Sequence, residues 1–290
     1  MKLFKRHNNV LPGFGLTLGF TLFYLSVIVL IPLSALVFRT TGLTWGEFIS
    51  TVTAPRVLAS YKVTYGAAMI AAVINSIFGV LVAWVLVRYR FPGRRIVDAL
   101  VDLPFALPTA VAGITLATIY SPNGWVGRYL EPLGVKVAFT PLGITLAMTF
   151  IGLPFVVRTV QPVVEEIEVE LEEAAVCLGA TRWQTLVKLV LISASPGIFS
   201  ASMIGFGRAI GETMIVLMAT GNTPIMDWSL FNGFRTLSAN IAVEIPEAPH
   251  GGTLYRILFL AAMLLFVFTF LINTVAEIVR QRLRTKYSQY

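Results

Sequence analysis

Cysteine, histidine and charged residues are scarce in this chain. Its 290 residues include one cysteine, Cys177, and two histidines, His7 and His250. A single cysteine excludes an internal disulfide framework, and three isolated residues offer no ligand set for a metal. Asp, Glu, Lys and Arg make up 13% of the residues and hydrophobic residues 56%. Soluble domains carry about 25% charged residues, so this composition indicates a protein that is not surrounded by water alone.

The sequence also lacks the G-x-x-x-x-G-K-[ST] loop that cradles ATP phosphates in P-loop proteins. We therefore expect no ATP and no other cofactor on this chain. The apolar segments contain no Ser/His pair, paired carboxylates or cluster of metal ligands, so no catalytic residue is predicted. An intramembrane enzyme is accordingly disfavoured.

Long apolar runs are abundant, and each of six is long enough to cross about 30 Å of hydrocarbon. The fold class predicted is all-α, a polytopic membrane protein with about six transmembrane helices. One transmembrane domain would occupy 13–278, between short termini at 1–12 and 279–290. The expected spans lie near 13–38, 62–87, 103–120, 137–160, 196–221 and 256–278. Kinks are expected at the prolines inside or at the ends of these spans, Pro32, Pro104, Pro108, Pro141 and Pro154.

The basic residues indicate how the chain is oriented. The net charge is +7, but Lys and Arg form short clusters between apolar runs, which argues against a nucleic-acid partner. With the N-terminus inside, fourteen Lys and Arg lie on the cytoplasmic side and seven outside. By the positive-inside rule, this bias predicts that both termini are cytoplasmic.

The segment 161–195, between the fourth and fifth spans, carries the clearest functional pattern. Its first part is rich in glutamate, with six glutamates from Glu165 to Glu173, and apolar residues recur at helical spacing on both sides of Gly179. This pattern predicts two short amphipathic helices that meet at a glycine turn. Such a pair suits docking into a cleft of another protein, and a solvated acidic loop is the alternative.

The sequence EEAAVCLGATRWQTLVK, residues 172–188, resembles the EAA loop of importer permeases in the ATP-binding-cassette superfamily. The resemblance implies a cytoplasmic coupling loop that transmits movement from an ATPase. One departure is Leu191-Ile192, where the family usually has Leu-Pro. The coupling residues that the resemblance implies are Glu173, Ala174, Ala175, Gly179, Ala180 and Arg182.

The resemblance also implies partners and a location. They are a second permease subunit, two ATP-binding subunits that hold the ATP, an extracytoplasmic oxyanion-binding protein and the lipid bilayer. The location implied is a bacterial cytoplasmic (inner) membrane. The external segment 222–255 would face the binding protein, and simple exposure to solvent is the alternative for it. A membrane scaffold without transport is a further alternative, which binding of an ATPase partner would exclude.

Two parts of the chain resemble permeases for different substrates. The stretches VDLPFALPTAVAGITLATIYSPNGWVG, residues 101–127, and FVVRTVQPVVEE, residues 155–166, resemble sulfate/thiosulfate permease subunits, as does the chain up to about residue 204. From about residue 205 to 290, stretches such as GRAIGETMIVLMATGN resemble phosphate permease subunits instead. The sequence therefore predicts import of sulfate or thiosulfate and leaves phosphate open.

Charged and proline-flanked residues inside the spans are candidates for the translocation pathway. Arg208 and Glu212 lie one helical turn apart in the fifth expected span, where charge is expensive unless it is paired or faces a cavity. Arg208 could attract an oxyanion, or the two could form an ion pair that only orients the helix. Thr109, with Pro108 and Gly113 in the third span, could belong to a gate, although helix packing explains this composition better.

Overall fold

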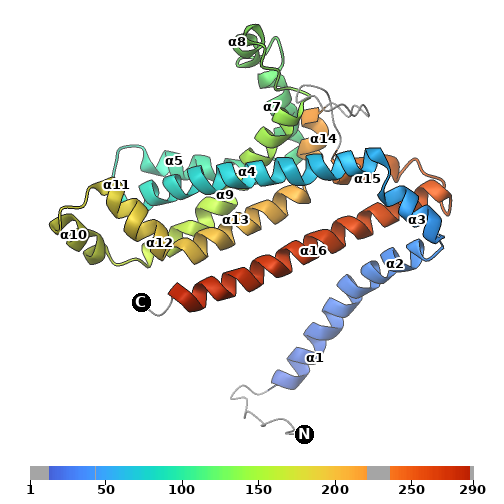
Figure 1. The fold of residues 1–290 in the computed structure, drawn as a ribbon, viewed down its shortest axis with the longest axis horizontal. Helices are drawn as coiled ribbons and strands as arrows, with labels where there is room; N and C mark the ends of the chain where they lie inside the picture. Colours follow the sequence, from blue (N-terminus) through green and yellow to red (C-terminus); the bar gives the residue numbers. More distant parts are fainter. Residues whose placement is uncertain (1–12, 43, 221–235, 288–290) are drawn as a thin grey trace.

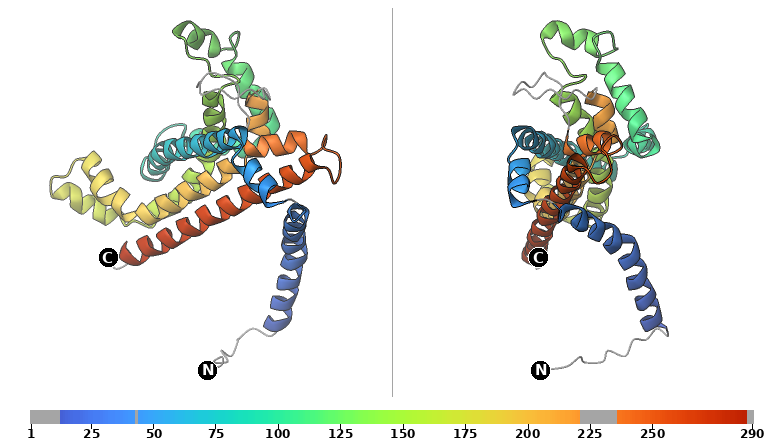
Figure 2. Two further views of the ribbon diagram at one scale, coloured as in Figure 1. Left: turned by 45° about the vertical axis from the view of Figure 1, so that its right-hand side comes forward. Right: turned by 90° about the vertical axis from the view of Figure 1, so that its right-hand side faces the viewer.

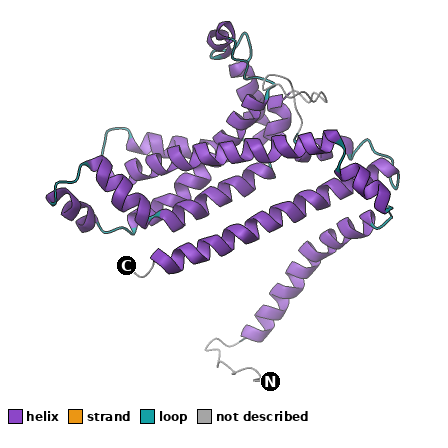
Figure 3. Ribbon diagram, viewed as in Figure 1, coloured by secondary structure: helices purple, strands orange, loops and turns teal. Residues whose placement is uncertain are grey.

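The computed structural model describes residues 13–42, 44–220 and 236–287, and its regular structure there is helical throughout (Figures 1 and 3). The all-α class is confirmed. The first half contains α1 Phe14–Leu25, the π-helical turn η1 Ser26–Leu30, α2 Ile31–Thr40, α3 Trp45–Val52, α4 Pro55–Arg88, α5 Arg94–Val101, α6 Leu103–Ala106, α7 Thr109–Tyr120, α8 Gly127–Leu130 and the 3-10 turn η2 Glu131–Leu133.

The second half begins with the long helix α9 and ends with the longest one, α16. Its elements are α9 Pro141–Glu165, α10 Val169–Cys177, α11 Arg182–Thr185, the π-helical turn η3 Leu186–Val190, α12 Leu191–Ser193, α13 Ser195–Ile210, α14 Met214–Thr220, α15 Leu237–Glu244 and α16 Thr253–Tyr287. The predicted N-terminal segment 1–12 lies outside the described residues. The predicted C-terminal segment 279–290 continues the last span without a break as far as Tyr287, because α16 extends to that residue.

Helices α4, α9 and α13 form the centre of the molecule, where they run side by side (Figure 1). Small residues permit their close approach. A Cβ on Gly79 of α4 would lie 2.8 Å from Cγ1 of Val156 on α9, which is fully buried. Ser76 of α4 and Ser202 of α13 share a hydrogen bond of 2.6 Å. Glycine and serine at helix contacts are typical of membrane bundles, where apolar surface alone gives no force between helices.

Four helical stretches in the described residues are long and apolar enough to span a membrane: 14–40, 57–88, 141–165 and 253–282. A fifth is possible if 182–193 and 195–210, which meet at an angle of 74°, form one bent span. The remaining predicted span, 103–120, yields the shorter apolar helix α7. The polytopic character is confirmed, with fewer uninterrupted spans than the hydropathy pattern predicts.

The third predicted span, 103–120, is wrong as a single helix. Helix α6 ends at Ala106, and α7 starts at Thr109 after an extended Leu107 with ψ 133°. Pro108 causes this break, because its ring disfavours the helical conformation at the preceding residue and it has no N–H to donate. By contrast, Pro154 lies inside the continuous helix α9.

The fifth predicted span, 196–221, is also interrupted. Helix α13 ends at Ile210, three residues follow, and α14 begins at Met214. Helix α15 stabilises the interruption, since the hydroxyl of Ser238 donates a 2.9 Å hydrogen bond to the carbonyl of Glu212. The backbone N–H of Leu237 donates at 3.1 Å to the hydroxyl of Thr64 on α4. The hydroxyl of Ser238 thus replaces part of the hydrogen bonding that a continuous helix would supply, and the hydroxyl of Thr64 fixes the start of α15 against α4.

Gly113 provides a test of the packing between α7 and α14. A Cβ on this glycine would lie 2.7 Å from the backbone carbonyl oxygen of Ile215, which cannot rotate away. A Gly113→Val variant should be destabilised by about 1–3 kcal/mol because the helices must separate. The expected result is a lower thermal midpoint of the purified protein. Gly19→Val on α1 is the control, since a Cβ there meets no atom within 4 Å, and an unchanged midpoint for both variants would contradict the packing.

The first span stands away from the bundle (Figures 1 and 2). No residue of α1 or α2 is buried, although this stretch has a mean hydropathy of 2.4. Among the described residues, its C-terminal part, α2, lies against α16: the guanidinium of Arg39 stacks over the rings of Tyr255 and Phe259, and Thr40 approaches the sulfur of Met263. Just beyond α2, the carbonyl of Gly42 accepts a hydrogen bond from Arg256. The apolar surface of α1 is therefore left for lipid or for another subunit.

Candidate functional site

The segment 166–195 forms the two short helices joined at a glycine that the sequence predicts, and we call it the coupling segment. It begins later than predicted, because α9 extends to Glu165. Helix α10 ends at Cys177, Gly179 adopts φ +88°, and α11 begins at Arg182. Thr181 and Gln184 form a capping box that fixes the start of α11. The turn is therefore defined locally by the sequence.

Hydrogen bonds explain why glycine occupies position 179. The N–H of Ala180 donates to the carbonyl of Ala175 at 3.0 Å, and the N–H of Gly179 donates to the carbonyl of Val176 at 2.9 Å. These two bonds form a Schellman motif, which requires a left-handed residue directly after the helix. Glycine adopts this conformation without the steric cost that a Cβ would add.

The predicted coupling residues gather on this surface. Glu173 and Ala174 of α10, Gly179 of the turn and Arg182 of α11 are exposed, whereas Ala175 and Ala180 are half-buried. Large apolar side chains lie exposed beside them, with 89% of Leu178 and 66% of Trp183 accessible. An exposed apolar surface next to small residues can pack closely against a second protein.

Sequence reasoning missed the residue that connects this segment to the bundle, Arg88 at the end of α4. Its Nε donates to Glu172 of α10 at 2.7 Å. Its Nη2 donates to the backbone carbonyls of Val164 at 3.0 Å and Ile167 at 2.6 Å, which lie at and just beyond the C-terminal end of α9. Both charged side chains are largely buried, at 13% and 16% exposed. One guanidinium therefore ties α4, α9 and α10 together.

A second arginine, Arg158 of α9, holds α5 in the same region. It binds Asp98 at 2.7 Å through Nη1 and Asp102 at 2.8 Å through Nε, and it also contacts Gln161. The hydrogen bond from Arg158 lowers the pKa of the Asp102 carboxyl below its usual range. The sequence offered only a weak signal for both arginines, because their partners lie 56 to 84 residues away.

The structure brings Arg208 and Glu212 together as an ion pair, with 2.7 Å between Nη1 and Oε2. Glu212 is 4% exposed and Arg208 38% exposed. The contact lacks hydrogen-bond geometry at Oε2, so attraction between the charges accounts for it. Contrary to expectation, Glu212 is not in a helix but in the break after α13. The pair therefore stabilises an interruption and not a continuous span.

Arg208 also lines a hollow of about 450 Å³ at the α13–α16 contact, together with Asn273, Glu277 and Arg280 of α16. The Arg208 guanidinium is therefore accessible to a polar solute in the hollow, while the buried carboxylate of Glu212 balances its charge. Thr109, the third predicted pathway residue, is half-buried at the start of α7. No hydrogen bond connects it with the pair in the part of the chain that is described.

The predicted external segment 222–255 is described from residue 236 onward. That part is not an open loop, because it contains α15, whose first residues are buried against α4. Residues 222–235 lie outside the described part of the chain. No group of three or more His, Cys, Asp and Glu arranged to hold a metal ion occurs in the described residues.

Comparison with known proteins assigns this architecture. The family described as "Binding-protein-dependent transport system inner membrane component" matches residues 75–285. The chain belongs to this family. It is thus a multi-pass inner-membrane permease of the ATP-binding-cassette type, a transport component and not an enzyme.

Relatives of this permease include the sulfate transport system permease protein CysT of Escherichia coli (strain K12). It is 46% identical over 267 residues, covering 92% of this chain and 93% of that protein. The protein of the same name from Synechococcus elongatus is 49% identical over 208 residues, covering 72% of this chain and 75% of that protein. The 267-residue match is longer than the 204 residues to which the resemblance seemed confined. The expected change to a phosphate-permease pattern after that point has no support from these relatives.

Solved structures share the fold of the permease. A bacterial ABC transporter involved in the import of the acidic polysaccharide alginate superposes with a TM-score of 0.71 at 18% identity, covering 90% of this chain and 92% of that one. The MetNI methionine ABC transporter superposes with a TM-score of 0.57 at 19% identity, covering 78% of this chain and 95% of that one. At these identities the likeness concerns the fold alone.

Proposed function

We propose that this permease carries sulfate, and thiosulfate as a close analogue, across the inner membrane into the cell. The observation that supports this most is the 46% identity to a sulfate permease over 92% of the chain. Arg208 fits the substrate class, because a guanidinium beside a hollow can meet an oxyanion with two parallel hydrogen bonds. Glu212 would prevent tight trapping of the anion.

The coupling segment would receive the movement of an ATPase. In this proposal, two ATP-binding subunits dock on the surface around Glu173 and Ala174, a second permease subunit completes the pathway, and an external binding protein delivers the anion. Both termini would lie in the cytoplasm. The exposed apolar side chains of the coupling segment and the link through Arg88 support this assignment, since a docked helix needs a rigid connection to the spans.

Uptake of labelled sulfate and labelled phosphate would test the substrate. Cells that lack their own permeases for both anions would express this chain, with the partner subunits of a sulfate or a phosphate importer supplied in turn. Sulfate uptake with the sulfate partners is the expected result. Phosphate uptake would overturn the sulfate assignment and favour a phosphate importer instead. Absence of both, with the protein in the membrane and bound to its ATPase, would contradict transport of either anion.

The glycine turn of the coupling segment gives a further prediction. Gly179→Val would force a β-branched residue into φ +88°, which costs roughly 1–2 kcal/mol and disturbs the junction of α10 and α11. Uptake should fall severalfold while the amount in the membrane stays near normal, as measured by labelled anion and immunoblot. The control is Gly134→Val, which imposes a similar strain at φ +77° far from the coupling segment. An equal loss of uptake in both variants would argue against a special role for this turn.

A further inference from the structure

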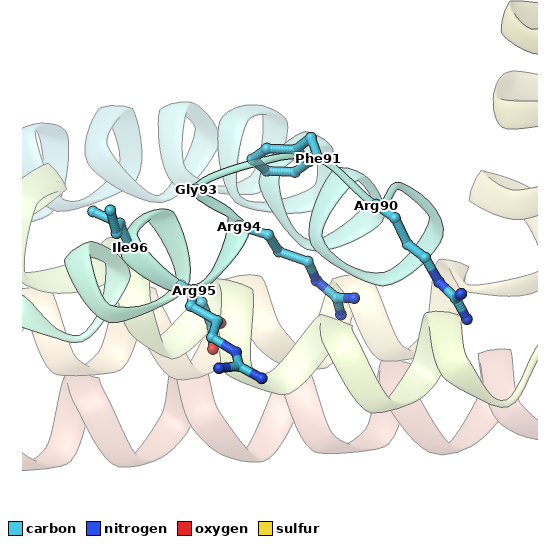
Figure 4. A pocket seen from close by; sticks show the side chains of 7 residues that line it. Arg90, Phe91, Gly93, Arg94, Arg95 and Ile96 are labelled. Atoms are coloured by element: carbon cyan, nitrogen blue, oxygen red, sulfur yellow. The ribbon is translucent and has the colours of Figure 1, made fainter.

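A basic hollow of about 620 Å³ lies where α4 turns into α5 (Figure 4). The chain leaves α4 in an extended conformation at Tyr89 and turns at Gly93, which has φ +87°. Arginines 90, 94 and 95 line the hollow together with Asp98. Figure 4 shows the three guanidinium groups extending from one side of this turn. The fold therefore gathers three positive charges within six residues.

These charges are not neutralised within the described part of the chain. Arg90, Arg94 and Arg95 are exposed and form no ion pair with any described residue. The one carboxylate that lines the hollow, Asp98, is bound by Arg158. An anion with several oxygens can satisfy such a group of guanidinium donors, and phosphate matches their planar fork.

The helix that follows the hollow is amphipathic in a way that favours a lipid. Ile96 and Leu100 of α5, and Leu103 at the start of α6, follow one another at helical spacing and are 67%, 57% and 44% exposed. The opposite face carries Asp98 and Asp102, both held by Arg158. Helix α5 is thus anchored by its acidic face, with its apolar face outward and arginines at its start, as in helices that lie in the membrane interface.

We propose that this hollow binds the phosphate of an anionic phospholipid, whose acyl chains lie along Ile96, Leu100 and Leu103. A soluble phosphate would use the arginines alone and leave the apolar face uncovered. An acidic protein surface would likewise leave these three side chains without apolar contacts. Because Arg158 connects α5 to α9, a lipid here would brace the end of the bundle that carries the coupling segment. The site is independent of which anion is transported.

Native mass spectrometry of the full chain, purified with the subunits that accompany it, would test this site. The complex would be exchanged into mild detergent with phosphatidylglycerol or phosphatidylcholine, and the bound lipids counted. We expect about tenfold stronger retention of phosphatidylglycerol, since each arginine near a membrane surface adds attraction for anionic lipid. A double variant, R94Q/R95Q, should reduce this retention to the level of phosphatidylcholine. A second variant, I96S/L100S, should weaken it while all three arginines remain.

The control is K136Q/R282Q, which removes two exposed positive charges outside both the hollow and the coupling segment. If it reduces lipid retention as much as R94Q/R95Q does, the attraction is general and the site is overturned. Displacement of the lipid by millimolar glycerol 3-phosphate, with no effect of I96S/L100S, would also overturn it, because the ligand would then be a free phosphate. Loss of the ATPase subunit from R94Q/R95Q with unchanged lipid retention would overturn it in favour of a protein contact.

Discussion

An Arg88→Gln variant is expected to reach the membrane but to take up sulfate about tenfold more slowly or worse, while ATP hydrolysis by the assembled transporter continues. The substitution removes the guanidinium that joins the end of α4 to Glu172 of α10 and to two carbonyls at the end of α9. Hydrogen bonds to charged groups contribute about 1.5–3 kcal/mol each when they are shielded as these are. Without this link, movement of α10 would not reach the spans as a rigid displacement.

Matched variants separate coupling from folding. Glu172→Gln removes only the charged partner and should give an intermediate loss of uptake, whereas Arg282→Gln, an exposed arginine on α16, should change nothing. Uptake of sulfate and release of inorganic phosphate from ATP would be measured in the same vesicles. Normal uptake by Arg88→Gln in a complex that retains its ATPase would contradict the proposed link.

Arg208→Gln carries the second large expected effect, a loss of uptake of about tenfold or more. When made by itself, this substitution also leaves the Glu212 carboxylate, which is 4% exposed, without the cation that pairs with it. Breaking a buried ion pair from one side typically costs about 3–5 kcal/mol. The amount of protein in the membrane should therefore fall as well, and a single variant cannot separate transport from stability.

The double variant R208Q/E212Q resolves this ambiguity. It removes both charges while preserving the size of both side chains, so the amount in the membrane should recover. If Arg208 acts on the transported anion, uptake per molecule stays low in the double variant. If the pair only stabilises the break after α13, uptake recovers with the protein level. The decisive measurement is the initial rate of sulfate uptake divided by the amount of permease in the membrane.

Hydropathy and local turn chemistry predicted much of this fold. The long spans α4, α9 and α16 fall where apolar runs exceed the thickness of a bilayer. The turn at Gly179 was predictable because the Schellman motif needs only neighbouring residues. A proline alone did not reveal its effect: Pro108 ends a helix, while Pro154 lies inside one. Kinking in membrane helices depends on which neighbours satisfy the freed carbonyl.

The contacts that hold the candidate site together were not predictable from one sequence. Arg88 counted only as a positive charge on the cytoplasmic side, because its partner Glu172 lies 84 residues away and is one of six nearby glutamates. The break around Glu212 depends on Ser238 of α15, which supplies a hydrogen bond across 26 residues. Such pairings are fixed by tertiary packing, so hydropathy and helical spacing carry no signal for them.

Helix α9 is the least apolar of the four long spans, with a mean hydropathy of 1.6 over an 18-residue stretch, and the most enclosed, with 56% of that stretch buried. The helix α1–α2, with a hydropathy of 2.4 and nothing buried, is the opposite extreme. A less apolar span is less stable in lipid alone and depends more on neighbours that cover its polar groups. Biogenesis of the permease should therefore depend on order: the first span can remain in the bilayer by its own hydropathy, whereas α9 needs α4 beside it. Quality-control proteolysis would accordingly act first on chains in which α9 has not yet found that neighbour.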